Sequence, residues 1–85
     1  MTWTVRFSDR ARRELARLDR QDAARVVAAV ERFATTGYGD VKRLQGPSGE
    51  LRLRVGELRV RFRRDEEARL LEILRVLPRG RAYRD

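Results

Sequence analysis

Residues 51–62, LRLRVGELRVRF, alternate strictly between apolar side chains and arginine. This alternation is typical of β-strands that bury one face and expose the other. The dipeptide Gly56-Glu57 interrupts it and predicts a turn between two strands. The resulting hairpin needs a second layer over its apolar face, which consists of Leu51, Leu53, Val55, Leu58, Val60 and Phe62.

The N-terminal part of the chain predicts that second layer. Residues 2–7 alternate as a half-buried strand, and Ser8 then provides an N-cap for a short amphipathic helix. Asp19 caps a second helix, whose apolar stripe runs over residues 23–34 until Gly37 ends it. The two helices therefore form a hairpin with almost no loop.

The remaining segments complete the sheet. Residues 36–50 are irregular, with a short extended piece at 41–44, and residues 64–67 form a polar turn. Residues 68–77 are apolar on both faces, which predicts a strand in the middle of a sheet. The order strand, helix, helix and three strands predicts a single α+β domain over residues 1–85. Its small antiparallel-type sheet carries a two-helix hairpin on one face.

The charge of the chain points to a polyanionic partner. It has 21 Lys and Arg against 13 Asp and Glu, a net charge of +8, and Lys42 is its only lysine. The absence of cysteine excludes disulfides and thiolate metal sites, and the absence of histidine removes the usual general base. We expect no cofactor and no metal. We also expect a cytoplasmic protein without a membrane partner, since no apolar run or signal-peptide core is present.

The outward positions of the hairpin carry Arg52, Arg54, Arg59 and Arg61. Like charges opposite each other on a sheet are destabilising, and a bound anion would relieve the repulsion. Acidic residues are scarce on this face, because Glu57 is in the turn and Glu50 is at the strand edge. The alternative is that arginine merely fills the solvated face of an arginine-rich chain, and the pattern alone does not decide between them.

The ordered set of segments resembles the RelE/ParE superfamily of bacterial type II toxin–antitoxin toxins, in particular the RelE-like branch. The resemblance rests on the hairpin LRLRVGELRVRF, the apolar strand after it and the ending PRGRAYR. It is also carried by RARREL and LDRQDAARVVAAV in the helices and by LQG before the hairpin. It covers nearly the whole chain.

The resemblance implies a ribosome-dependent mRNA endoribonuclease that inhibits translation without a metal. In the RelE branch the ribose 2′-OH attacks the adjacent phosphate and leaves a 2′,3′-cyclic phosphate. The family's catalytic positions correspond here to Arg52, Arg54, Arg59, Arg79 and Tyr83. We expect further RNA contacts from Arg43, Arg61 and Arg81.

Two departures from the family concern proton transfer. Arginine stands at positions 52 and 54, where some members have lysine, and Leu77-Pro78 replaces the usual glycine–histidine before Arg79. Arginine does not deprotonate in proteins. The candidate bases are then Tyr83, a ribosomal or substrate group, or a carboxylate of Glu50, Glu57 or Asp85.

The resemblance also implies partners. We expect a small cognate antitoxin with an acidic C-terminal segment, the ribosome and mRNA, and contact with operator DNA only through the antitoxin. Two other functions remain open. One is a ParE-like, non-catalytic toxin that inhibits DNA gyrase, and the other is a plain nucleic-acid-binding domain.

Overall fold

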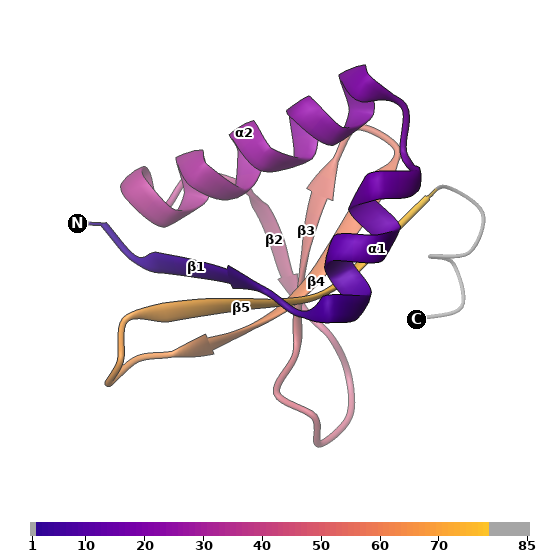
Figure 1. Cartoon of the computed structure of the whole chain (residues 1–85). Coiled ribbons are helices and arrows are strands. Elements are labelled where there is room, and N and C mark those ends of the chain that lie inside the picture. Colours follow the sequence, from indigo (N-terminus) through magenta and orange to yellow (C-terminus); the bar gives the residue numbers. More distant parts are fainter. Residues whose placement is uncertain (1, 79–85) are drawn as a thin grey trace.

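The computed structural model describes residues 2–78, which form an open five-stranded sheet covered on one face by two helices (Figure 1). This arrangement confirms the predicted α+β class and element order. In chain order the elements are β1 (Thr4–Phe7), α1 (Asp9–Arg17), α2 (Arg20–Thr36), β2 (Asp40–Arg43), β3 (Leu51–Val55), β4 (Leu58–Asp65) and β5 (Leu70–Leu77).

The helix boundaries follow from local hydrogen bonds. The Ser8 side chain accepts from the backbone N–H of Ala11 at 3.0 Å, which caps α1. The Asp19 carboxylate accepts from the N–H of Asp22 at 2.8 Å, which caps α2. Gly37 ends α2 in the left-handed region, with φ 79°. All three predicted caps are confirmed.

The strands lie in the order β1-β5-β4-β3-β2. Neighbours from β2 to β5 are antiparallel, as expected, whereas β1 pairs parallel to β5. The connection between these two strands is long, as a parallel pair requires, because both helices and the strands β2, β3 and β4 lie between them in the chain. β5 therefore lies between β1 and β4, which confirms the central position predicted from its apolar faces.

Several strand boundaries differ from the predicted ones. β1 begins at Thr4 instead of residue 2, and β2 covers Asp40–Arg43 instead of residues 41–44. β4 runs on to Asp65, and the turn to β5 occupies residues 66–69. A register shift also separates Arg61, which pairs with Arg75, from Phe62, which pairs with Ile73. Leu74 is the extra residue at this bulge. The bulge explains why β5 does not alternate, because Ile73 and Val76 are both buried although three positions apart.

The core lies between the helices and the sheet. Its largest fully buried side chains come from α2, β4 and β5, and they are Phe62, Leu71, Ile73, Val26, Val30, Val60 and Val76. Phe33 packs edge-to-face on Phe62, with ring centroids 5.5 Å apart. Neither helix among residues 2–78 is long and apolar enough to cross a membrane.

Candidate nucleic-acid interface

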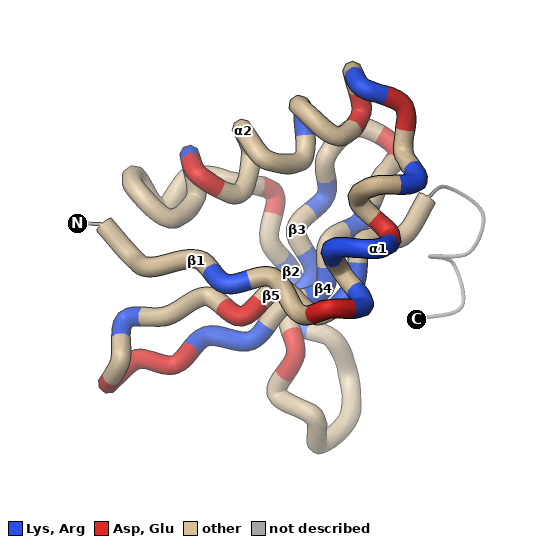
Figure 2. The backbone as a smooth tube through the Cα atoms, in the orientation of Figure 1, with Lys and Arg blue, Asp and Glu red and all other residues tan. Residues whose placement is uncertain are grey.

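The β3–β4 hairpin presents paired arginines on the face of the sheet that the helices leave open. Arg52 lies opposite Arg61, and Arg54 lies opposite Arg59. The alternate residues Leu53 and Val60 are buried under the helices. Figure 2 shows the basic positions of β3 and β4 close together near the centre of the sheet. Four of the arginines expected in the site thus occupy neighbouring positions on one face.

Arg52 is the most enclosed of these cations for which the structure gives an ion pair. Its side chain is only 13% exposed, and its Nη2 lies 3.6 Å from Oδ1 of Asp40 on β2. Its Nε is buried without a hydrogen-bond acceptor among the described residues. A buried donor left without an acceptor costs about 1–3 kcal/mol. The fold therefore holds Arg52 on this face at an energetic cost.

Glu50 folds onto the same face from the loop before β3. Its Oε1 accepts from Nε of Arg61 at 3.0 Å and lies 2.8 Å from Nη2 of that residue. Its Oε2 lies 3.7 Å from Nη2 of Arg63. The face is therefore less free of acids than its strand pattern indicated, since residues outside the two strands supply carboxylates.

Two further cations extend the cluster beyond the hairpin. Lys42 on β2 lies opposite Arg52, and Arg75 on β5 lies opposite Arg61. Sequence patterns gave no signal for either residue, because the registers of β2 and β5 depend on tertiary pairing. The open face thus carries basic residues from four adjacent strands.

Arg75 is joined to α1 through Glu14. The Glu14 carboxylate accepts from Nε of Arg75 at 3.0 Å and from the backbone N–H of Val76 at 2.8 Å. Burial by itself raises the pKa of Glu14. The hydrogen bonds from Arg75 and Val76 and the charges of Arg75 and Arg10 outweigh that effect and lower the pKa below its ordinary value. Glu14 therefore stays ionised and anchors the β5 end of the cluster.

Of the other expected site residues, the structure describes only Arg43, which does not join this cluster. Arg43 lies opposite Leu51, so alternation places it on the helix side of the sheet, away from Arg52. The expected catalytic residues Arg79 and Tyr83 and the expected RNA contact Arg81 lie outside the described residues.

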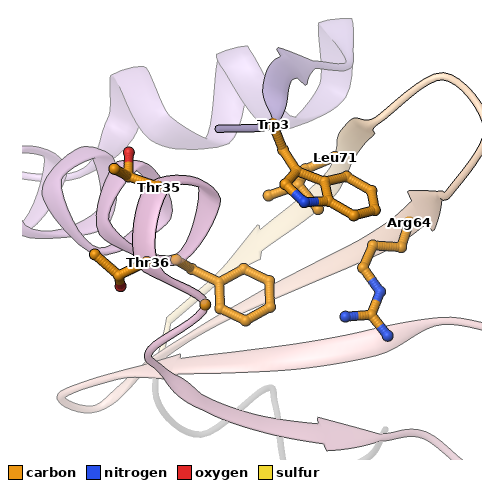
Figure 3. Close-up of a pocket in the computed structure, with 7 residues that line it drawn as sticks. Trp3, Thr35, Thr36, Arg64 and Leu71 are labelled. Carbon is orange, nitrogen blue, oxygen red and sulfur yellow. The ribbon is translucent and has the colours of Figure 1, made fainter. Parts of the chain in front are cut away.

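A pocket of about 200 Å³ lies on the helix side of the sheet (Figure 3). Trp3, Phe33 and Leu71 provide apolar walls, and Arg64 and two threonines of α2 complete it. It is smaller than the roughly 300–1,000 Å³ of typical ligand sites. It also lies on the face opposite the paired arginines, so it is not part of the candidate interface.

A two-helix hairpin over one face of a mixed sheet, with paired arginines on the other face, defines a small α+β protein of RelE-like fold. Residues 5–83 match the family model described as the ParE toxin of the type II toxin–antitoxin system parDE. Because the match covers nearly the whole sequence, the chain belongs to this family and to the RelE/ParE superfamily. It is a toxin of a type II toxin–antitoxin system.

Solved structures of similar fold come from bacteria and archaea. A chain of the RelBE2 toxin–antitoxin complex from Mycobacterium tuberculosis is 33% identical, with a TM-score of 0.83 over 93% of this chain and 100% of that chain. A chain of the archaeal RelE–RelB complex from Pyrococcus horikoshii OT3 is 24% identical, with a TM-score of 0.79 over 95% and 99%. The isolated Escherichia coli RelE toxin is 13% identical, with a TM-score of 0.76 over 98% and 93%. The last two show a shared fold. No curated protein sequence matches the chain.

Proposed function

We propose that this toxin is an endoribonuclease that cleaves mRNA on the ribosome and so inhibits translation in the cytoplasm. The observation that carries the proposal is the strand register that places Arg52 opposite Arg61 and Arg54 opposite Arg59 on the open face. Such pairs are unfavourable unless anions compensate them. Asp40 and Glu50 do so from outside the two strands, and a phosphate over the face would add to this compensation. The relative of known structure at 33% identity comes from a complex named RelBE2, which also favours the RelE branch.

The proposed reaction is an internal transfer at phosphorus. The 2′-oxygen forms a bond to the adjacent phosphorus, its proton passes to a base, and the bond from phosphorus to the 5′-oxygen breaks as that oxygen takes up a proton. Negative charge grows on the non-bridging oxygens. Fixed guanidinium groups stabilise it electrostatically, and alignment of the 2′-oxygen with the leaving oxygen lowers the barrier further.

The residues divide between these tasks. We assign phosphate stabilisation to Arg52, Arg54, Arg59 and Arg79, and stacking or proton transfer to Tyr83. Glu50 remains a candidate base, because its carboxylate already lies on the open face against Arg61. Glu57, Asp85, Tyr83 and a ribosomal or substrate group are the other candidates for that step.

Primer extension on a reporter mRNA after induction tests the proposal. We expect discrete cleavage ends with the unmodified toxin and none with Arg59→Ala, while growth inhibition falls in parallel. Arg6→Ala is the matched control, because Arg6 lies on β1 in an ion pair with Glu72, 3.6 Å away. Intact mRNA under full growth inhibition would refute ribonuclease activity.

Inhibition of DNA gyrase is the second candidate, because the matching family model is described as a ParE toxin. A supercoiling assay with purified gyrase separates the two functions. Loss of supercoiling at toxin concentrations that leave mRNA intact would favour this second function.

We also propose that the partner is an antitoxin with an acidic, amphipathic segment, which alone links the toxin to operator DNA. A groove of about 530 Å³ between α2 and the β2–β3 edge suits such a segment. Its floor is apolar, with Ala29, Leu53 and Val55, and Arg25 and Arg32 of α2 are among its lining residues. Carboxylates on a docked segment would pair with these arginines while its apolar residues cover the floor.

A further inference from the structure

One row of side chains on the open face crosses four strands and carries only positive charges. Lys42 lies opposite Arg52, Arg52 opposite Arg61, and Arg61 opposite Arg75. Adjacent strands are about 4.8 Å apart, so the row extends about 14 Å at right angles to the strands. The Arg52–Asp40 contact of 3.6 Å shows that Asp40, and with it Lys42 two residues later, shares the face of Arg52.

The neighbouring rows are not uniform in charge. On one side Arg63 lies opposite Glu72, which lies opposite Arg6 of β1 and pairs with it at 3.6 Å. The neighbouring row on the other side contains Asp40 on β2, Arg54 and Arg59 on the hairpin, and Leu77 on β5. The same arginine-rich chain thus interrupts its other rows with acidic or apolar residues. The uniform row is therefore not explained by composition alone.

We propose that the backbone of single-stranded RNA crosses the sheet along this row, and that Lys42 binds one of its phosphates at the β2 end. The identity of the polyanion rests on the proposed function. The direction of the RNA backbone rests on the strand register. A chain of phosphates relieves the repulsion between the cations only where it follows the row in which all charges are positive. Arg75 is tied to Glu14 at the β5 end, so Lys42 is the exposed end of the row.

The proposal distinguishes two adjacent residues of β2. Lys42 and Arg43 have the same charge, and both are exposed. Lys42 lies opposite Arg52 on the open face, whereas Arg43 lies opposite Leu51 on the helix side. The proposal therefore assigns the RNA contact of this strand to Lys42, whereas the sequence suggested Arg43. Substitution of each by alanine removes one charge from nearly the same place.

The test is fluorescence anisotropy with a labelled single-stranded RNA that carries 2′-O-methyl riboses and so cannot be cleaved. Affinity is measured over a salt series for the unmodified chain, Lys42→Ala and Arg43→Ala. Loss of one phosphate contact lowers the slope of log affinity against log salt by about 0.7 for a single strand. We expect this reduction in Lys42→Ala and an unchanged slope in Arg43→Ala.

Three outcomes would overturn the path. Equal losses in the two variants would mean that the RNA responds to net charge, and a loss confined to Arg43→Ala would place the RNA on the other face. An unchanged slope in Lys42→Ala would remove the contact. In each case the cleavage test with Arg59→Ala still decides the proposed function by itself. Failure of the unmodified chain to bind at low salt would overturn the path across the sheet and leave the proposed function to the cleavage test. Circular dichroism of each variant checks that the fold is intact.

Discussion

Glu14→Ala should destabilise the fold more than any other substitution of an acidic residue on the helices. The Glu14 carboxylate is 19% exposed and joins α1 to β5 through the N–H of Val76 at 2.8 Å and the guanidinium of Arg75 at 2.8 Å. Hydrogen bonds to a charged group contribute about 1.5–3 kcal/mol. Because both groups lose their acceptor and are partly buried, we expect a loss of about 2–3 kcal/mol at neutral pH.

The lowered pKa of Glu14 gives this effect a pH dependence. A carboxyl group that binds its proton less tightly in the folded state stabilises the fold fully above its unfolded pKa. That stabilisation is lost as the pH falls through the folded pKa, which here lies below the ordinary value of about 4.3. The gap in unfolding free energy between the unmodified chain and Glu14→Gln should therefore shrink at acidic pH.

Thermal and urea unfolding followed by circular dichroism measure both effects. For a domain of this size, a loss of 2 kcal/mol lowers Tm by about 8–16 °C. Glu31→Ala is the matched control, because Glu31 lies exposed on α2 and its removal should change stability by less than about 0.5 kcal/mol. Equal stability of Glu14→Ala and Glu31→Ala, or a gap that persists at acidic pH, would refute the reasoning.

Three further predictions concern the turn, the open face and the partner. Gly37→Ala should lose about 1 kcal/mol in urea unfolding, because φ is 79° at this helix end, whereas an alanine at exposed Glu31 should not. Glu50→Gln should raise the affinity for uncleavable RNA, because Arg61 loses the carboxylate that neutralises it. The rate at which this variant cleaves mRNA shows whether Glu50 is also the base. Stopped-flow association with the antitoxin should slow as salt rises, since the charges involved are exposed. A rate indifferent to salt would mean that apolar burial alone drives association.

Strong local patterns predicted most of the fold. The alternation at 51–62 placed the arginines of β3 and β4 on one face, and Ser8, Asp19 and Gly37 marked the helix ends where the structure has them. These features depend on neighbours in sequence. The parallel pairing of β1 with β5 and the bulge at Leu74 depend on how distant segments meet, and no local pattern encodes them.

The same distinction applies to the candidate interface. β2 has only four residues, from Asp40 to Arg43, and a pattern that short does not define which side chains face the core. Because strand side chains alternate, a shift of one residue exchanges the two faces. The sequence therefore did not show that Lys42, and not Arg43, shares the face of Arg52. Pairing with β3, which places Val41 opposite buried Leu53, is what decides the face of each residue.

The acidic residues of the open face show how the fold tolerates its uniform row of cations. Asp40, Glu50 and Glu14 come from β2, a loop and α1, and they contact Arg52, Arg61 and Arg75 respectively. None of the three belongs to the strand of the cation that it contacts. Each cation is thus compensated from the side, which leaves room for an anion over the sheet. A carboxylate within the row itself would stabilise the sheet better, but it would repel the phosphates that we propose cross it. The row itself therefore holds no acidic residue, which is the arrangement that the proposed RNA path requires.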